Sequence, residues 1–349
     1  MKSNFLFQAG PGCFLTRFVL PGCLFVCALP AGLLAQTVAF TGTSTLGSGF
    51  NDLRGVAVDG NGNVYVADTG NNAVKEILAV GGSIPASPTI ETLGSGLVAP
   101  YGVAVDGSGN VYVADSAQSA VYEMLAVDGS VPASPTIRTL GSGFKYPWGL
   151  AVDGSGNVYV GDYGNHDVYE MLAVGGSIPA SPTIRTLGSG FSGPFGLAVD
   201  GSGNVYVADD YNVAVYEMLA VGGSIPASPT IRTLGSGFTG PSGVAVDGSG
   251  NIYVADFGAS KVYEMLAVGG SIPATPVTKT LGSGYSYPTG VALEPVINFA
   301  PVNPMESARL SQSDWNSGGN SECIPCHISR APRFTRVLSI RATHAAPQS

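Results

Sequence analysis

Short runs of alternating hydrophobic and polar residues recur along most of the chain, separated by turns rich in glycine and proline. The stretch 139–185 shows the unit. Its strand-like runs read GLAVD, VYVGD, VYEMLAV and TIRTL, and the turns DGSGN and GGSIPASP lie between them. Aromatic and β-branched residues at alternate positions are typical of β-strands. No helical spacing of apolar residues is sustained, which excludes helical arrays and leucine-rich horseshoes.

This unit repeats with a fixed step of 47 residues. Its TLGSG start recurs at Thr45, Thr92, Thr139, Thr186, Thr233 and Thr280. Its core glycine recurs at Gly55, Gly102, Gly149, Gly196, Gly243 and Gly290. Four strands per repeat of this length are typical of a propeller blade. We therefore predict an all-β fold over residues 36–303, a β-propeller of about six four-stranded blades built from five complete repeats and a composite closing blade.

The closing blade is expected to join the two ends of the repeat region. The segment TVAFTGTSTL before the first repeat is suited to an outer strand, and GVALEPVINFA after the last supplies an inner strand. Closure of this kind leaves no sheet edge exposed. The turn of this blade departs from the others, because Glu294 and Pro295 replace the DG pair and no VYEMLAV run follows.

The run from Leu53 to Ile77, LRGVAVDGNGNVYVADTGNNAVKEI, resembles the NHL repeat. The likeness lies in the AVD-x-x-GN-hydrophobic-YVAD core and the TGNN that follows, and it recurs in the later units. It departs at Ala73, where that family often has arginine, and the unit is lengthened by SIPASP. The resemblance covers residues 40–299. It implies a bacterial, exported β-propeller, most often six-bladed, whose relatives are commonly binding or scaffolding modules.

The first 35 residues have the composition of a secretory signal peptide. Lys2 and Arg17 precede an apolar run that ends at Leu34, with no acidic residue among them. Prolines interrupt this run, which disfavours a retained membrane anchor. We expect residues 1–35 to be removed on export. A lipoprotein site at Cys23 is the alternative. Either way, we expect a secreted, periplasmic or cell-surface protein.

Residues 304–349 lack the repeat, and we predict a mostly disordered tail there. The tail carries Cys323, Cys326 and His327 as a C-x-x-C-H motif, in which c-type haem is bonded to two thiols while the imidazole ligates iron. Only 22 residues follow His327, and they predict no helices that would enclose a haem. We therefore expect no cofactor. A local disulfide or a chance match is the alternative interpretation of the motif.

Charge narrows the classes of partner. The net charge is −9, and because each end of the chain carries a net +2, the repeat region carries −13. A body of this charge is repelled by nucleic acid and by anionic lipid. We expect a monomer with a protein or carbohydrate ligand, no nucleic-acid partner and no stable membrane span after processing.

The turns and strands of the repeat are expected to be structural. The DGSGN turn resembles the start of a calcium loop, but the distal glutamate that such a loop needs is missing, so its aspartate is expected to bond the backbone of the turn. No metal is predicted. Glutamates on the third strand and cations on the fourth should pair across each hairpin, at Glu123, Glu170, Glu217 and Glu264 with Arg138, Arg185, Arg232 and Lys279. In the first repeat, Glu76 faces Glu91 instead.

Differences between the repeats fall into two windows, the link before the core glycine and the link after the YVAD strand. In an up-and-down blade both links lie on one face of the propeller, which we call the variable face. Its candidate ligand-binding residues are Arg54, Tyr101, Lys145, Tyr146, Trp148, Tyr163, His166, Phe195, Tyr211, Phe257 and Tyr287. Clusters of exposed aromatic residues favour recognition of a partner or glycan. Drift in loops under little constraint would also diversify this face.

The sequence thus favours a non-enzymatic binding or interaction module that acts through the variable face. His166 is the one histidine in the repeats, and no Ser-His-Asp set, phosphate loop or three-histidine metal cluster can be assembled from them. We predict no catalytic residues. The alternatives are a propeller lyase or hydrolase that resembles virginiamycin B lyase, and a haem-bearing tail for electron transfer.

Overall fold

The computed structural model describes residues 46–281, 285–293 and, for the backbone, 337–341. The predicted signal peptide, the segment expected to supply the first outer strand and the C-x-x-C-H motif lie outside the described residues. Within those ranges there is no α-helix, and one turn of 3-10 helix, η1, spans Thr69–Asn71. None of the described segments is a helix with the length and apolar character needed to cross a membrane.

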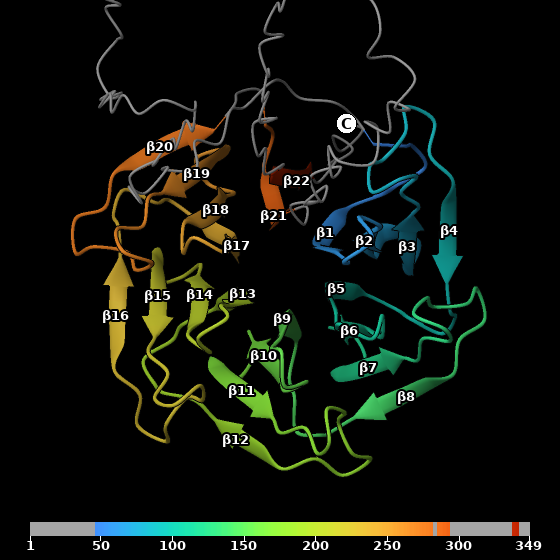
Figure 1. Ribbon diagram of the computed structural model, residues 1–349, viewed down its shortest axis with the longest axis horizontal. Helices are drawn as coiled ribbons and strands as arrows, with labels where there is room; N and C mark the ends of the chain where they lie inside the picture. Colours follow the sequence, from blue (N-terminus) through green and yellow to red (C-terminus); the bar gives the residue numbers. More distant parts are fainter. Residues whose placement is uncertain (1–45, 282–284, 294–336, 342–349) are drawn as a thin grey trace, which may run out of the picture. The chain divides into compact units, whose positions relative to one another are not determined.

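Five four-stranded antiparallel sheets follow one another along the chain, one for each complete repeat. Their strands are β1 (Leu53–Val58), β2 (Val64–Asp68), β3 (Ala73–Ile77) and β4 (Ile90–Leu93); β5 (Pro100–Val105), β6 (Val111–Asp115), β7 (Ala120–Met124) and β8 (Ile137–Leu140); β9 (Pro147–Val152), β10 (Val158–Asp162), β11 (Asp167–Met171) and β12 (Ile184–Thr186); β13 (Pro194–Val199), β14 (Val205–Asp209), β15 (Ala214–Met218) and β16 (Ile231–Leu234); and β17 (Pro241–Val246), β18 (Ile252–Asp256), β19 (Lys261–Met265) and β20 (Thr278–Leu281). Figure 1 shows these sheets as propeller blades around a central opening, with β1, β5, β9, β13 and β17 innermost.

The closing blade differs from its prediction. β21 (Pro288–Leu293) is the expected inner strand and lies between β17 and β1 in the ring. Its antiparallel partner is β22 (Val337–Arg341), so the described residues form a two-stranded sheet here. About six four-stranded blades were predicted, five complete and one composite, and the described residues form five four-stranded blades and this two-stranded sheet. The repeat signal after Leu293 is lost, and β22 comes instead from the segment where no regular structure was expected.

The core of the propeller lies between successive blades. The second strand of each repeat is buried on both faces, as the pattern of β10 shows. Its side chains pack against the neighbouring blade: Tyr112 and Val121 of one blade share an apolar cluster with Leu150 and Val160 of the next. Such layers of β-branched and aromatic side chains stabilise the ring without disulfides, because each sheet buries both faces against its neighbours.

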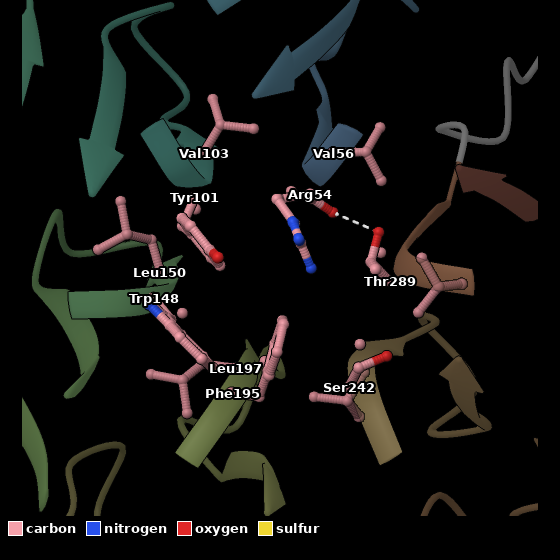
Figure 2. Close-up of a pocket in the computed structure, with 18 residues that line it drawn as sticks. Arg54, Val56, Tyr101, Val103, Trp148, Leu150, Phe195, Leu197, Ser242 and Thr289 are labelled. Carbon is pink, nitrogen blue, oxygen red and sulfur yellow. Dashed lines mark hydrogen bonds between the residues drawn. The ribbon is translucent and has the colours of Figure 1, made fainter. Parts of the chain in front are cut away.

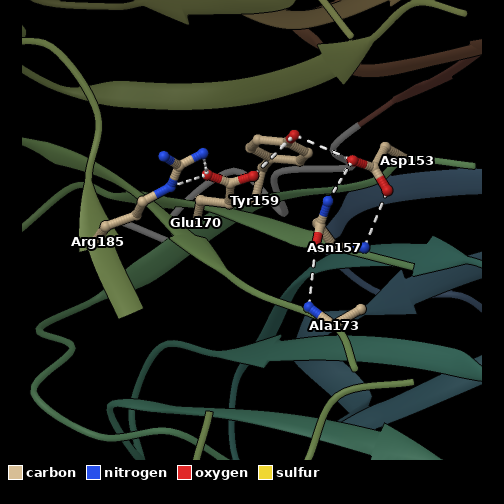
Figure 3. A network of polar contacts seen from close by, with 6 residues as sticks. All are labelled: Asp153, Asn157, Tyr159, Glu170, Ala173 and Arg185. Atoms are coloured by element: carbon tan, nitrogen blue, oxygen red, sulfur yellow. Dashed lines mark hydrogen bonds and ion pairs between the residues drawn. The ribbon is translucent and has the colours of Figure 1, made fainter. Parts of the chain in front are cut away.

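Each complete blade contains the same contacts between a tyrosine, an aspartate and a glutamate, and four of the five blades add a cation that pairs with the glutamate. In the third blade, the Tyr159 hydroxyl lies 3.1 Å from Asp153 Oδ2 and 3.2 Å from Glu170 Oε1, and Arg185 Nε donates to Glu170 Oε2 at 2.5 Å (Figure 3). The register places Glu170 directly opposite Arg185. The predicted pairing is confirmed in four blades, where Glu123 faces Arg138, Glu217 faces Arg232 and Glu264 faces Lys279 in the same way.

The aspartate of the DGSGN turn organises that turn, as the sequence predicts. Asp153 Oδ1 accepts hydrogen bonds from the backbone N–H groups of Ser155 and Asn157, both at 2.9 Å. The Asn157 side chain then accepts the backbone N–H of Ala173 at 2.8 Å, which ties this turn to the start of the SIPASP link (Figure 3). Among the described residues, no group of three histidine, cysteine or acidic side chains is arranged to hold a metal.

The first blade lacks the cation, and this gives a pH-dependent prediction. Glu76 is buried opposite Glu91, and burial raises its pKa, with further increases from Asp59 and Glu91. Because the pKa of Glu76 is higher in the folded state than in the unfolded state, its contribution to the free energy of unfolding is complete below the unfolded-state pKa. That contribution is lost as the pH rises through the folded-state pKa. Glu91→Arg would supply the missing partner. We expect it to raise the free energy of unfolding at pH 8 by about 1 kcal/mol and to reduce the loss of stability between pH 5 and pH 8.

Urea denaturation at both pH values measures this effect. Glu91→Gln is the control, because it removes the like charge without adding a cation and should give only part of the gain. The assignment of the pH dependence to Glu76 would be contradicted if the Glu91→Arg variant lost as much stability as the wild type between pH 5 and pH 8.

Candidate functional site: the channel mouth on the variable face

Six equivalent positions surround the central opening, one on each inner strand. Each is the residue before the core glycine, and the 47-residue step relates them. In chain order they are Arg54, Tyr101, Trp148, Phe195, Ser242 and Thr289 (Figure 2). They line a cavity of about 60 Å³ on the axis, together with the glycines and aliphatic residues that follow them. Equivalent positions of the repeat thus carry a different side chain in every repeat at this place.

The two hydroxyl residues of this set fasten neighbouring blades together. Ser242 Oγ lies 3.1 Å from the carbonyl oxygen of Ala255 and 3.0 Å from that of Pro288, on the next inner strand. Thr289 Oγ1 lies 3.0 and 3.1 Å from the carbonyl oxygens of Leu53 and Arg54, which joins β21 to β1 (Figure 2). Both residues are 2% exposed. Their hydroxyl protons are thus engaged at the closure of the ring.

Arg54 provides the positive charge of the cavity lining. Its guanidinium points into the opening (Figure 2) and lies 5.1 Å from the centre of the Tyr101 ring. Nη2 pairs with Asp52 Oδ2 at 3.0 Å. Within the described part of the chain, Nε of Arg54 and Oδ1 of Asp52 are buried without a hydrogen-bond partner. An unsatisfied buried donor is uncommon in folded proteins, so this guanidinium has unused hydrogen-bonding capacity.

Aromatic side chains continue from Arg54 across the variable face. We call the set Tyr101, Trp148, Tyr163, Phe195 and Tyr211 the aromatic belt. Its ring centres are 4.8 Å apart for Tyr101 and Trp148, 3.6 Å for Trp148 and Tyr163, and 5.2 Å for Tyr163 and Tyr211. Phe195 contacts Trp148 edge-on at 4.8 Å. Tyr211 is 58% exposed and ends the belt. The belt thus combines side chains from three blades in one rigid surface.

Trp148 is the centre of the belt rather than an open platform. Tyr101 and Tyr163 stack on its two neighbouring sides at interplanar angles of 10° and 22°, and its indole N–H donates to Ser116 Oγ at 3.1 Å. Because the faces of Trp148 are engaged by these rings, a ligand meets mainly the edges and hydroxyls of the tyrosines. Stacked aromatic side chains lose little conformational entropy on binding and are frequent at interaction hot spots.

The last residue of the second strand holds the two variable windows together. Asp162 is fully buried at the end of β10 and accepts the backbone N–H of Lys145 at 2.8 Å and that of Asn165 at 3.1 Å. Backbone hydrogen bonds from Tyr163 to Tyr146 and from Gly164 to Lys145 join the same two links. The sequence-based expectation that both links share one face is thereby met. The equivalent aspartates make corresponding contacts in the other complete blades, at Asp68, Asp115, Asp209 and Asp256.

The other predicted residues lie apart from the channel mouth. His166 is exposed, with a φ of 59°, and its ring centre is 6.5 Å from that of Tyr211. Phe257 and Tyr287 form a separate pair at 4.9 Å. Lys145 is exposed, and Tyr146 is 49% exposed without a ring contact among the described residues. The eleven predicted residues therefore comprise Arg54, the five residues of the aromatic belt beside it, one separate pair and three exposed side chains, Lys145, Tyr146 and His166.

Sequence reasoning missed three residues around this site. Asp52, Ser242 and Thr289 are neither aromatic nor basic, so the pattern of aromatic and basic residues in the variable windows does not mark them. The 47-residue step was the signal that would have found Ser242 and Thr289, since it relates them to Trp148. The same step relates Asp52 to Tyr146 and Tyr287, and all three have a positive φ. The ion pair of Asp52 with Arg54 has no counterpart there and is visible only in the structure.

One acidic side chain on the variable face has no hydrogen-bond partner in the described ranges. Asp210 follows the buried Asp209 and lies beside Gly240, whose Cβ, if added, would be 3.3 Å from Asp210 Oδ1. Burial raises the pKa of Asp210, and the charges of Asp209 and Asp256 raise it further. In turn, burial raises the pKa of Tyr163, with contributions from Tyr211 and Asp210. Asp210 is therefore easier to protonate than an exposed aspartate.

Comparisons with known proteins agree with this architecture. The NHL repeat family matches residues 50–77, 144–168 and 238–262. No curated protein sequence matches the chain significantly. Among solved structures, the chain is similar to virginiamycin B lyase from Staphylococcus aureus, with 12% identity, a TM-score of 0.50 and coverage of 69% of this chain and 74% of that one.

Two further enzymes have similar structures. A gluconolactonase from Xanthomonas campestris shares 16% identity with a TM-score of 0.52, covering 69% of this chain and 79% of that one. A luciferin-regenerating enzyme shares 17% identity with a TM-score of 0.50, covering 70% and 80%. Likeness at such low identity concerns the fold alone. The protein is thus a β-propeller that carries NHL repeats in three places.

Proposed function

We propose that this propeller is a non-enzymatic binding module, whose protein or carbohydrate ligand docks on the variable face over the aromatic belt. The observation that carries the proposal is the belt itself, a contiguous set of aromatic rings that begins at Tyr101 beside Arg54 and ends at the exposed Tyr211. Residues of these types dominate the binding energy at interfaces. Export of the mature protein to the periplasm, cell surface or medium is part of the same proposal.

The channel lining supports binding over catalysis. Its six equivalent positions offer one guanidinium, three aromatic rings and two hydroxyls that already contact backbone carbonyl oxygens. Acid–base catalysis needs a titratable group within reach of the substrate. No histidine, cysteine, aspartate or glutamate is among the described residues that line the cavity.

An enzymatic propeller is the second candidate, and Asp210 is the residue that favours it. A carboxyl whose pKa is raised by burial and by neighbouring acids is suited to proton transfer. The similar solved structures include a lyase and a gluconolactonase, so the fold is compatible with catalysis. This candidate predicts that Asp210→Asn abolishes turnover of a lactone or cyclic ester panel, whereas the binding proposal predicts no turnover by the wild type.

A capture experiment with matched variants tests the binding proposal. The purified propeller is immobilised and incubated with extracellular extract, and retained proteins and glycans are identified. We expect the double variant Trp148→Ala with Tyr163→Ala to lose the specifically retained ligand. Tyr211→Ala should weaken retention without altering the fold, because its side chain is 58% exposed.

The control places two substitutions on the opposite face. Val174→Ser with Val221→Ser changes side chains that are each 72% exposed at the start of the SIPASP links, and it should leave retention unchanged. Thermal melting of every variant separates loss of binding from loss of folding. Equal retention by the belt variants and the wild type would overturn the proposal.

A further inference from the structure

We infer that the axial cavity is a subsite for a carboxylate group, bound by the guanidinium of Arg54. This inference rests on the proposed function and deepens it, because it assigns a chemical class to the part of the ligand that enters the channel mouth. The remainder of the ligand then lies on the aromatic belt.

The first reason is the incomplete coordination of Arg54. A guanidinium has five N–H donors, and Asp52 Oδ2 accepts the hydrogen bond from Nη2 at 3.0 Å. Nε is buried without a partner among the described residues, and the group faces the cavity (Figure 2). A planar carboxylate matches the fork of a guanidinium and can accept two of its N–H groups in parallel.

The second reason is the size and composition of the cavity. The cavity of about 60 Å³ is open to solvent and larger than the roughly 10–15 Å³ that one water needs, so a carboxylate group can enter it beside Arg54. A phosphate or sulfate presents more oxygens than one guanidinium can satisfy, and the hydroxyls of Ser242 and Thr289 already contact carbonyl oxygens. The single available charge thus selects a group with one negative charge.

The third reason is Asp52, which acts as an internal competitor. Its carboxylate pairs with Arg54 and is 28% exposed, while its Oδ1 is buried without a partner within the described ranges. The free protein therefore already places one carboxylate against this guanidinium, in a geometry that leaves atoms of both groups unsatisfied. A ligand carboxylate that binds from the cavity side would share or replace this contact, and removal of the Asp52 charge should strengthen ligand binding.

Fluorescence of Trp148 gives a direct measurement. The chain has two tryptophans, and Trp315→Phe leaves Trp148, which lines the cavity, as the only tryptophan, so that excitation selective for tryptophan reports on this residue. Benzoate is the probe, because it joins a carboxylate to a ring that can contact the belt, and benzamide is its neutral counterpart. We expect benzoate to change the emission saturably and benzamide to bind at least about tenfold more weakly, since charge-assisted hydrogen bonds are the stronger ones.

Variants on the two sides of the ion pair should shift affinity in opposite directions. Arg54→Met should abolish benzoate binding, Arg54→Lys should weaken it by losing the fork geometry, and Asp52→Asn should tighten it severalfold. The opposite response of Asp52→Asn keeps the test informative if Arg54→Met folds poorly. Equal affinity for benzoate and benzamide, or an unchanged affinity in Arg54→Lys and Asp52→Asn, would overturn the inference.

Two further titrations identify the source of the carboxylate and separate this inference from the proposed function. An acetylated, amidated Gly-Asp-Gly peptide and galacturonate carry the group on a peptide and on a sugar, and tighter binding of either one identifies the class of ligand. The subsite fails if none of the three carboxylates binds. The binding-module proposal fails separately, if belt variants retain the captured ligand while benzoate still titrates Trp148.

Discussion

Gly102→Ala is expected to destabilise the propeller by about 3 kcal/mol or more, because among the described glycines an added Cβ meets its shortest backbone contact here. A Cβ on Gly102 of β5 would lie 2.1 Å from the carbonyl oxygen of Trp148 on β9. A backbone oxygen cannot rotate away as a side chain can, so the two inner strands would have to separate. The same contact recurs at Gly149, whose Cβ would lie 2.3 Å from the Phe195 carbonyl oxygen.

Urea denaturation measures this loss, and Gly107→Ala is the matched control. Gly107 is exposed in the DGSGN turn and has no atom within 4 Å of its added Cβ, so its substitution should change the free energy of unfolding by less than about 0.5 kcal/mol. Equal unfolding midpoints for the two variants would show that the inner strands can move apart freely. The core glycine of the repeat would then need another explanation.

Asp162→Ala is expected to lower the free energy of unfolding by about 3 kcal/mol and to loosen the variable face of the third blade. The substitution removes the carboxylate that accepts the backbone N–H groups of Lys145 and Asn165, and it leaves both donors unsatisfied. These two links carry Trp148 and Tyr163. We therefore expect the aromatic belt to lose its stacking and the ligand retained by the wild type to be released.

Amide hydrogen exchange distinguishes this mechanism from a general loss of stability. Protection should fall most at Lys145 and Asn165, and less in the outer strand β12 of the same blade. Asp128→Asn is the control, because Asp128 is exposed at a turn with a φ of 53° that asparagine also tolerates. Unchanged protection at Lys145 and Asn165 in Asp162→Ala would contradict the role assigned to this aspartate.

The blade could be predicted from the sequence in considerable detail. Strand number and order, the facing of Glu170 and Arg185, and the structural role of Asp153 follow from contacts between strands that are neighbours in the chain. Short antiparallel hairpins set their own register through turn length and alternating burial. The prediction was wrong at the closing blade because β21 pairs there with β22, a strand that lies far away in the sequence.

The candidate site was predicted only in part. The variable windows identified the correct face and the members of the belt, because nearly identical repeats make their differences conspicuous. They did not show that Phe257 and Tyr287 pair away from the belt, or that both sides of Trp148 are engaged by tyrosines. Those contacts depend on the angles between neighbouring blades, which no single repeat encodes.

The sequence by itself determined the repeating unit, because each blade is stabilised by hydrogen bonds and packing between strands close together in the chain. Only the tertiary structure decided what the six positions around the axis do. Arg54, Tyr101 and Trp148 are separated by whole repeats, and they meet because the glycines let the inner strands approach. The closed ring brings these three residues, which differ between equivalent positions of the repeats, together in one cationic and aromatic channel mouth. This is where the ligand is expected to bind.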